Sequence, residues 1–296
     1  MNLIIGATGM VGSEICRLLI AEGKPVRAMV RETSEQTKVE KLESLGIQIV
    51  QGDLRERSTL RPALQGVTAV ITTISSMPFS YLAGENDIEK VDHDGMFDLI
   101  DEARANGVNH LIYTSFSGQI DLNFPLRNAK RSVEQHLVES GIEYTILRPS
   151  FFMEVWLTKS VGFDPDSAKV QLCGDGTQPT SYISYKDVAQ FAVECLDNPS
   201  AKDAILELGG PEQLSQLDAV MLFEETSGRT FEVQSIPEEA LQSQMDEATD
   251  PMQQSFSALM LCLANGDPID MRETLETFPV KLTSVRDYVR SVIDGT

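Results

Sequence analysis

Three glycines at three-residue intervals, Gly6, Gly9 and Gly12, stand in the segment GATGMVG near the amino terminus. They follow a short apolar run and precede apolar residues at helical spacing. Glycine lets the backbone turn sharply and approach a pyrophosphate, and the helix that follows presents unpaired N–H groups to it. The spacing differs from the G-x-G-x-x-G of most dinucleotide loops. The strand–turn–helix context nevertheless predicts a dinucleotide site, with a plain tight turn as the alternative.

Arg31 stands at the end of the second predicted strand, residues 25–30, where the choice of nucleotide is made. An acid at this place accepts hydrogen bonds from the ribose of NAD, whereas an arginine accommodates the 2′-phosphate of NADP. Arg27 shares the strand face of Arg31 but lies deeper in the strand. Glu32 is the neighbouring residue that favours NAD. We predict NADP(H) in preference to NAD(H), with a surface ion pair of Arg31 to Glu32 or Glu35 as the alternative.

Polar residues also follow the third and fourth predicted strands. Ligands of parallel sheets bind outside the carboxyl ends of the strands. Asp53 follows the third strand and is placed to accept a hydrogen bond from an adenine amino group. The fourth strand runs into the small polar segment 72–76, which we expect near the ribose and diphosphate. Ordinary turn chemistry is the alternative for both segments.

Alternating strand and helix patterns position these residues. Strands are predicted at 2–5, 25–30, 47–51, 69–74, 108–114 and 144–147, and helices between them at 10–22, 35–45, 60–64, 88–105 and 127–140. This order predicts an α/β fold with a doubly wound parallel (Rossmann-type) sheet. Helices dominate after Pro149, with strands expected near 169–173, 205–208 and 231–234. We therefore predict an NAD(P)-binding domain at 1–150 and a mostly helical substrate-side lobe at 151–296, partly interleaved with the sheet.

Composition excludes several classes of function. The 296 residues include 24 Lys and Arg against 45 Asp and Glu, a net charge of −21. That charge repels polyanions and anionic lipid, so we expect no nucleic-acid or membrane partner. No apolar run approaches the ~20 residues of a membrane-spanning helix, and the amino-terminal run reads as a strand rather than a signal peptide. Four scattered cysteines indicate reduced thiols in a cytoplasmic protein: Cys16, Cys173, Cys195 and Cys262.

The chain resembles the atypical short-chain dehydrogenase/reductase superfamily, specifically its NmrA-like branch, in motifs that occur in the same order: GATGMVG, VRAMVR, Gly52-Asp53-Leu54, VDHDG, Tyr113-Thr114-Ser115 and YTILRPSFFMEVW. That branch contains NADPH-dependent quinone, triphenylmethane and phenylpropanoid reductases, and also non-catalytic NADP-sensing regulators. The resemblance specifies fold and cofactor but no substrate. It implies these cofactor contacts: Gly6, Thr8, Gly9, Met10 and Val11 at the diphosphate, Arg31 at the 2′-phosphate, Asp53 and Leu54 at the adenine, Thr73 and Ser75 along the ribose, and Pro149, Ser150 and Phe151 near the nicotinamide.

The chain departs from the superfamily at the catalytic tyrosine. Short-chain dehydrogenases carry Tyr-x-x-x-Lys, in which the lysine lowers the tyrosine pKa for proton transfer. Leu126 occupies the tyrosine position here, and Lys130 remains. The resemblance implies that Lys130 binds the nicotinamide ribose or acts alone, while a surface ion pair with Glu134 is the alternative. The carbonyl-polarising serine falls near Ser115, so Lys130 and Ser115 are the candidate catalytic residues.

Other patterns indicate an apolar substrate and no metal. Phe151, Phe152 and Trp156 suit a flat, apolar acceptor, with core packing as the alternative. A second apolar stripe at helical spacing indicates a helix that covers the lobe or forms a dimer face: Met252, Phe256, Met260 and Leu263. The three histidines do not form a ligand cluster by spacing: His93, His110 and His136.

We therefore predict a cytoplasmic NADPH-dependent oxidoreductase that transfers hydride to an apolar quinone, carbonyl or other unsaturated acceptor. A quinone needs the least proton assistance, which suits the missing tyrosine. The partner is a small apolar or aromatic substrate, and the protein is a monomer or homodimer. The alternative from another class is a non-catalytic NADP(H)-sensing regulatory protein. A sugar-nucleotide epimerase or dehydratase is disfavoured, because that chemistry depends on the tyrosine and usually retains NAD.

Overall fold

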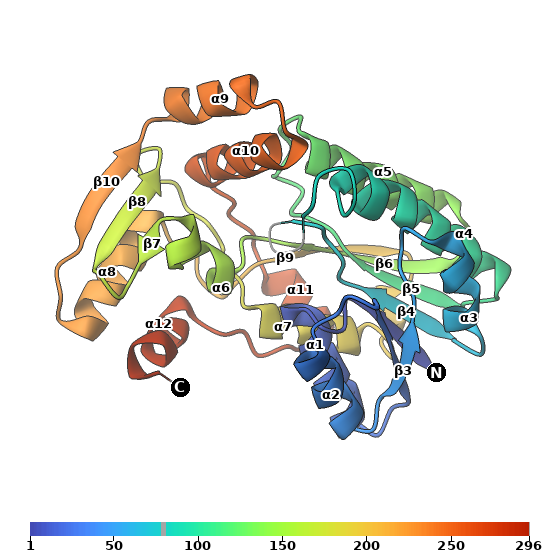
Figure 1. Cartoon of the computed structure of the whole chain (residues 1–296). Helices are drawn as coiled ribbons and strands as arrows, with labels where there is room; N and C mark the ends of the chain where they lie inside the picture. The colour runs from blue at the N-terminus through green and yellow to red at the C-terminus, as the bar shows by residue number, and fades with distance from the viewer. Residues whose placement is uncertain (78–80, 296) are drawn as a thin grey trace. The chain divides into compact units, whose positions relative to one another are not determined.

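The computed structural model describes residues 1–77 and 81–295, and its larger sheet confirms the predicted Rossmann-type fold (Figure 1). Seven strands stand in the order β3-β2-β1-β4-β5-β6-β9. Their bounds are β1 Asn2–Ile5, β2 Val26–Val30, β3 Gln48–Gln51, β4 Ala69–Thr72, β5 His110–Thr114, β6 Glu143–Pro149 and β9 Ala204–Leu208. Strands β1 to β6 pair in parallel, so their carboxyl ends lie along one edge. The order reverses between β1 and β4, the place where such sheets bind ligands.

Helices cover both faces of this sheet. Those on one face are α3 Leu60–Leu64, α4 Gly95–Ala105 and α5 Pro125–Glu139, and those on the other are α1 Met10–Ala21, α2 Gln36–Ser44 and α7 Tyr185–Glu194 (Figure 1). A core cluster joins the first set to the strands through residues such as Leu3, Val70, Leu99, Leu111 and Val133. Three shorter helices complete the connections: η1 Arg57–Thr59, η2 Ile88–Asp94 and η4 Pro199–Ala201. The helix expected at 88–105 is therefore two elements, because η2 is a π-helix that ends where α4 begins.

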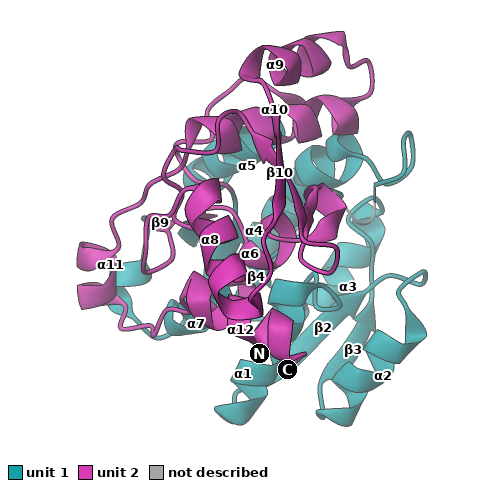
Figure 2. Cartoon of the chain, turned by 90° about the vertical axis from the view of Figure 1, so that its left-hand side faces the viewer, with its two compact units in different colours: residues 1–115, 128–147, 188–206 teal, residues 116–127, 148–187, 207–296 magenta. Residues whose placement is uncertain are grey.

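The chain groups into two compact units (Figure 2). Unit 1 comprises residues 1–115, 128–147 and 188–206, and unit 2 comprises residues 116–127, 148–187 and 207–296. Each unit is thus assembled from three separate stretches of sequence. No single cut in the chain separates them.

Unit 2 contains a second sheet in the order β10-β8-β7. Its strands are β7 Phe163–Asp164, β8 Lys169–Cys173 and β10 Glu232–Ile236, and its helices are α6 Met153–Trp156, η3 Lys159–Val161, α8 Gln216–Ser227, α9 Glu238–Glu247, α10 Pro251–Asn265, α11 Arg272–Thr277 and α12 Val285–Asp294. Residues 257–264 of α10 are all buried, and the helix packs against α9 and β8. Core packing therefore explains Met260 and Leu263 of the apolar stripe, whereas Met252 and Phe256 are only partly buried.

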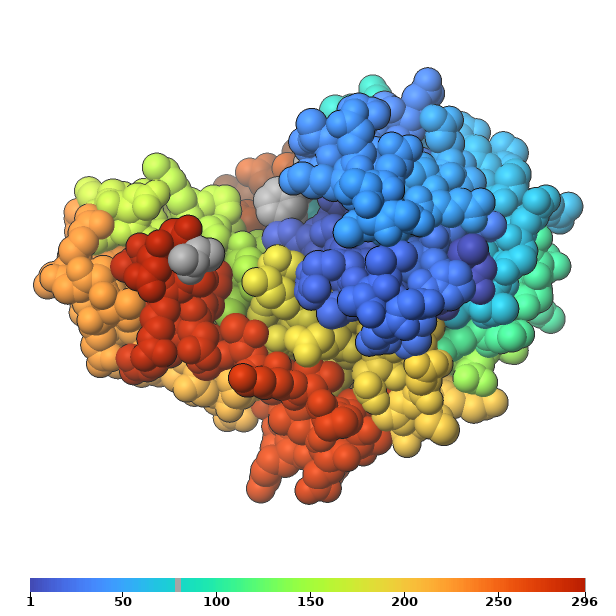
Figure 3. Space-filling model, turned by 90° about the horizontal axis from the view of Figure 1, so that it is seen from below, coloured from blue at the N-terminus to red at the C-terminus, as the bar shows by residue number. Residues whose placement is uncertain are grey.

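The carboxy-terminal helix α12 packs against α8 within unit 2. In the space-filling view the red carboxy-terminal segment lies beside the orange segment of the same unit (Figure 3). Ser284 caps α12 by accepting a hydrogen bond from the Asp287 backbone N–H at 3.0 Å. No helix within the described residues is long and apolar enough to cross a membrane.

Candidate functional site

The glycine loop joins β1 to α1 in a conformation that side chains would obstruct. Gly6 has a φ of +87°, and a Cβ atom there would lie 2.7 Å from the Thr73 hydroxyl oxygen. A Cβ on Gly12 would lie 2.2 Å from the Gly6 carbonyl oxygen, so the first turn of α1 packs directly on the loop. Gly9 precedes α1 and caps it with no side chain, and the first turn holds no acid. The helix therefore directs backbone donors and its positive end toward the loop.

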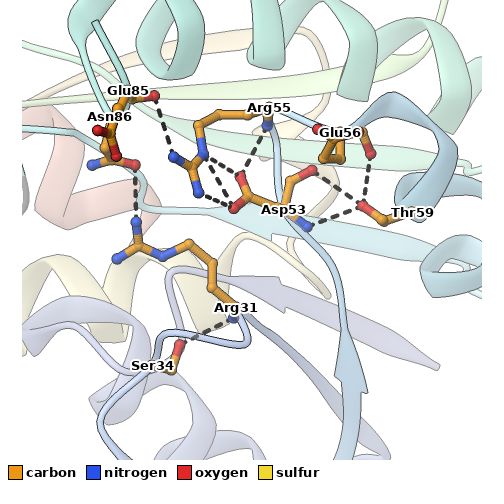
Figure 4. A network of polar contacts seen from close by, with 8 residues as sticks. All are labelled: Arg31, Ser34, Asp53, Arg55, Glu56, Thr59, Glu85 and Asn86. Carbon is orange, nitrogen blue, oxygen red and sulfur yellow. Dashed lines mark hydrogen bonds and ion pairs between the residues drawn. The ribbon is translucent and has the colours of Figure 1, made fainter. Parts of the chain in front are cut away.

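Arg31 lies where β2 ends and reaches across to the turn that precedes η2 (Figure 4). Its Nη1 atom donates to the Asn86 side-chain oxygen at 2.9 Å, and its backbone N–H donates to the Ser34 hydroxyl at 3.0 Å. Glu35 pairs with Lys38 instead, at 3.0 Å. Within the described residues Arg31 makes no ion pair with Glu32 or Glu35. The structure therefore does not contain the surface ion pair that was the alternative role for Arg31. The Arg31 side chain is instead hydrogen-bonded to a neutral amide.

Asp53 lies beyond β3 in the same network, bound by an arginine that the sequence analysis did not single out. The Arg55 Nη2 atom donates to Asp53 Oδ2 at 2.6 Å, and Arg55 Nη1 donates to the Glu85 carbonyl oxygen at 3.2 Å (Figure 4). Partial burial raises the pKa of Asp53, but the hydrogen bonds and charge of Arg55 outweigh it and hold that pKa below its ordinary value. Arg55 thereby forms an ion pair with Asp53, and the charge of Arg31 also lowers the pKa of Asp53.

Close backbone approaches fix the rest of this edge. A Cβ on Gly95, at the start of α4, would lie 2.8 Å from the Leu54 Cβ, so the helix packs on the buried segment that follows β3. Thr73 donates through its backbone N–H to the Ile5 carbonyl at 3.1 Å, which places it beside the glycine loop. The Ser75 hydroxyl accepts from the Met77 N–H at 3.3 Å. The structure thus brings the predicted β1, β3 and β4 residues to one edge of the sheet.

Lys130 enters the interior of unit 1 from α5. Its side chain is buried, and its Nζ atom donates to the Thr114 carbonyl oxygen at 3.3 Å and lies 5.3 Å from the centroid of the Tyr113 ring. Burial lowers the pKa of Lys130, while the charges of Asp92 and Glu134 raise it. Lys130 and Glu134 are both buried, so they do not form the surface ion pair that was the alternative role for Lys130.

Ser115 is held in a buried hydrogen-bonded group. Its hydroxyl donates to a Glu134 carboxylate oxygen, which also pairs with Arg131 at 2.5 Å. A hydroxyl that already donates to a carboxylate must leave it before it donates to a substrate carbonyl. The structure therefore gives Ser115 a structural partner that the sequence did not reveal.

The predicted nicotinamide neighbours Pro149, Ser150 and Phe151 belong to unit 2. Ser150 donates through its N–H to the Leu208 carbonyl oxygen at 2.8 Å. Phe151 packs edge-on against Trp156 at 4.9 Å between ring centroids, and Trp156 stacks with Phe256 of α10 at 6.3 Å. The aromatic residues of the sequence motif thus form one cluster in unit 2.

Leu126, at the position of the usual tyrosine, is buried in unit 2 and donates through its N–H to the Ser255 hydroxyl at 3.2 Å. The sequence analysis missed a buried acid in this unit, Asp267, which accepts from the Ser117 hydroxyl at 2.6 Å. Burial raises the pKa of Asp267, with the Ser117 hydrogen bond opposing it. Nothing in the spacing of the sequence pairs Ser117 with Asp267.

The histidines and cysteines form no metal site among the described residues, although His93 and His136 both stack on the Phe97 ring. In the part of the chain that the structure describes, no three His, Cys, Asp or Glu residues come together as a metal site. His93 stacks on Phe97, with 4.5 Å between centroids, and contacts Asp94, so it has a packing role. The four cysteines are free and buried, and burial raises the pKa of each thiol to about 12. Such thiols are not nucleophilic at neutral pH.

Comparisons place the chain among known proteins. The model of a family described as NmrA-like matches residues 2–289. The photosystem II assembly factor Ycf39 of Trieres chinensis is 31% identical over 79% of this chain and 72% of its own, and the isoflavone reductase homolog IRL of Zea mays is 26% identical over 97% and 96%. The structure of the NADPH-dependent quinone oxidoreductase QOR2 of Escherichia coli, complexed with NADPH, matches with a TM-score of 0.80, 22% identity and 99% coverage of both chains.

Proposed function

The chain belongs to the NmrA-like family, as its motifs predict, and on this premise we propose that it is an NADPH-dependent reductase of the atypical short-chain type. The observation that carries the proposal is Arg31, a guanidinium bonded to a neutral amide beside the glycine loop. An arginine at this strand end whose side chain is hydrogen-bonded to a neutral amide suits a 2′-phosphate. The quinone oxidoreductase and isoflavone reductase homolog among the matches are named for reductive activity.

The glycine loop holds the diphosphate in this proposal. The glycine loop leaves backbone donors for a ligand, because Gly9 places no capping side chain on the first turn of α1. Thr8 and Met10 flank it, and Met10 exposes 38% of its surface although it is apolar, as expected beside a bound nucleotide. Val11, the next residue of α1, is buried. Asp53 and Leu54 would meet the adenine, and Thr73 and Ser75 the ribose.

NADP(H) preference rests on the contrast between two neighbouring arginines. Arg55 forms an ion pair with Asp53, whereas the Arg31 Nη1 atom donates its hydrogen bond to the Asn86 amide oxygen (Figure 4). A phosphate dianion forms stronger, charge-assisted hydrogen bonds than an amide oxygen does. We therefore expect Arg31 to exchange Asn86 for the 2′-phosphate.

The acceptor is an apolar, flat molecule such as a quinone. Bound NADPH supplies a hydride from the nicotinamide C4, and reduction of the acceptor is completed by a proton from solvent or Lys130. The aromatic cluster of Phe151, Trp156 and Phe256 has the chemistry that suits such an acceptor. Because the aliphatic side chain of Leu126 has no acidic proton to donate, an electron-deficient acceptor that needs little proton assistance fits best.

Calorimetry with NADPH and NADH tests the proposal. We expect the natural protein to bind NADPH at least about tenfold more tightly, the equivalent of about 1.4 kcal/mol, and Arg31→Ala to abolish that preference. Lys38→Ala is the matched control, since it removes a nearby exposed cation that pairs with Glu35, and it should keep the preference. Equal affinities in the natural protein would contradict the choice of NADPH. No heat with either nucleotide would contradict the whole proposal.

A regulatory role is the second candidate, and Leu126 is the observation that favours it. A protein that only senses NADP(H) needs no proton donor, and Ycf39 is named as an assembly factor rather than as a reductase. Turnover with a panel of quinones, dyes and carbonyl compounds separates the two functions. NADPH oxidation with any of these acceptors supports the reductase. Tight binding without turnover, together with unequal NADP⁺ and NADPH affinities, supports the sensor.

A further inference from the structure

The buried acid Asp92 has no task in the site described above. It lies in η2 with 1% of its surface exposed. Its Oδ2 atom accepts hydrogen bonds from the Ser76 N–H at 3.0 Å and the Ser76 hydroxyl at 2.5 Å. Its Oδ1 atom has no hydrogen-bond partner among the described residues. Burial of a carboxylate with one oxygen unsatisfied costs free energy, unless a nearby cation compensates.

The topology places Lys130 next to this acid. Ser76, which holds Asp92, follows β4, and Thr114, which accepts from Lys130 at 3.3 Å, ends β5. Strands β4 and β5 are parallel neighbours, with Thr72 opposite Tyr113. Both side chains therefore converge on the carboxyl ends of the same two strands. Burial lowers the pKa of Lys130 and raises that of Asp92, while the charge of each favours the ionised form of the other.

The other groups around Lys130 do not replace Asp92. On α5, Glu134 also favours the ammonium form, but its carboxylate is bound by Arg131 at 2.5 Å, and Arg131 opposes the ammonium. On β5, burial keeps the pKa of Tyr113 well above its ordinary value, so the phenol is neutral. Asp92 receives its hydrogen bonds from the neutral Ser76, which leaves its negative charge to act on Lys130.

We propose that Asp92 is a positioning residue that holds Lys130 as an ammonium ion at the carboxyl ends of β4 and β5. The inference rests on the proposed function, in which Lys130 binds the nicotinamide ribose or supplies the proton. An ammonium group donates charge-assisted hydrogen bonds and has a proton to give, whereas a neutral amine has neither property. Cofactor affinity therefore depends on the protonation of Lys130, and Asp92 extends that protonation to higher pH.

The pH dependence of NADPH affinity tests this assignment. Asp92→Asn keeps the size of the side chain and an oxygen for Ser76, but removes the charge. We expect the alkaline loss of affinity to move about one pH unit lower, because the ammonium has lost its anionic neighbour. Asp94→Asn is the matched control: it removes an acid of the same helix whose side chain is 64% exposed, and it should leave the profile in place. An unmoved profile in Asp92→Asn would overturn the proposal.

Melting temperatures measured without cofactor test the Asp92–Lys130 pair independently of the proposed function. Lys130→Met leaves Asp92 buried without its cation, so we expect the melting temperature to fall by several degrees. Adding Asp92→Asn should restore part of that loss, because the stranded charge is gone. A double variant that melts no higher than Lys130→Met would refute the Asp92–Lys130 pair, and this comparison holds even if Asp92→Asn alone failed to fold. If the natural protein did not bind NADPH, the proposed function would fail while this coupling still tested the pair.

Discussion

Three arginines at the sheet edge, Arg27, Arg31 and Arg55, differ in the groups to which their side chains donate hydrogen bonds. Arg27 donates to the Ala63 and Gln65 carbonyl oxygens at 2.8 and 2.7 Å, and so ties β2 to the end of α3. Arg55 is bound to Asp53. Arg31 donates to the Asn86 side-chain oxygen, and Arg27 likewise donates through its Nε atom to the Gln48 side-chain oxygen at 3.1 Å. Arg27 and Arg55 thus bind groups of the fold itself, whereas the role proposed for Arg31 is to bind the 2′-phosphate.

Gly12 is predicted to be the more sensitive to substitution of the two glycines Gly9 and Gly12. A Cβ there would stand 2.2 Å from the Gly6 carbonyl oxygen, and backbone cannot move aside cheaply, so Gly12→Ala should cost about 3 kcal/mol of unfolding free energy. Gly9→Ala is the graded comparison, because its Cβ would stand 3.2 Å from the same oxygen, and about 1 kcal/mol is expected. Urea denaturation measures both. A Gly12→Ala protein as stable as Gly9→Ala would show that the loop adjusts freely.

Local patterns revealed only part of the site. The glycine loop and Arg31 were predictable because a strand, a turn and a helix follow one another in sequence. The Ser115–Glu134 and Ser117–Asp267 bonds were not, since each joins residues that only the folded chain brings together. Arg55 was missed for another reason: an arginine two residues after an acid has many rotamers, and its bidentate contact with Asp53 is a matter of geometry.

At the scale of elements, the period of apolar residues identified the strands and helices of the larger sheet but not their internal breaks. The helix expected at 88–105 changes from a π-helix to an α-helix at Gly95, where its backbone approaches Leu54. Leu54 is distant from Gly95 in the sequence, so no local pattern predicts this contact. The two-residue strand β7 escaped prediction because it is too short to show alternation.

His110 links three elements of unit 1 and makes stability depend on pH. Its Nε2 atom contacts the Thr145 hydroxyl at 2.8 Å, and that hydroxyl donates to the Ala201 carbonyl oxygen at 2.7 Å, so β5, β6 and η4 are joined. Burial lowers the pKa of His110, with nearby acids opposing it. The unfolded chain therefore takes up a proton first as the pH falls below about 6.5, and the folded state loses stability there.

Two variants check the role of His110. Chemical denaturation at neutral and mildly acidic pH should show that His110→Gln loses less stability on acidification than the natural protein does. Thr145→Val keeps the imidazole but removes its partner hydroxyl, so it should be about 1 kcal/mol less stable at neutral pH and should keep the pH dependence. Identical acid sensitivity of His110→Gln and the natural protein would assign the effect to other groups.

For the molecule as a whole, the net charge affects how an anion can bind, and the path of the chain affects which parts can fold alone. A net charge of −21 repels an anionic nucleotide at long range, so attraction must be local. Within unit 1, we expect that attraction from Arg31 at the end of β2 and from the amino end of α1. Salt screens the long-range repulsion more strongly than these short contacts. The fold thus confines favourable potential to one edge of a sheet in an otherwise acidic protein.

The interleaved path of the chain predicts that the first 150 residues do not fold alone. Residues 188–206 belong to unit 1, although the sequence pattern suggested a boundary at 150. This stretch supplies side chains that are fully buried, among them Val188, Phe191 and Ala201. A fragment of residues 1–150 lacks them and lacks β9 beside β6, so it exposes apolar surface and a strand edge. We expect it to show no cooperative thermal transition by circular dichroism, whereas the full chain melts cooperatively. A fragment that melted within a few degrees of the full chain would mean that residues 188–206 cover a core that is already complete without them.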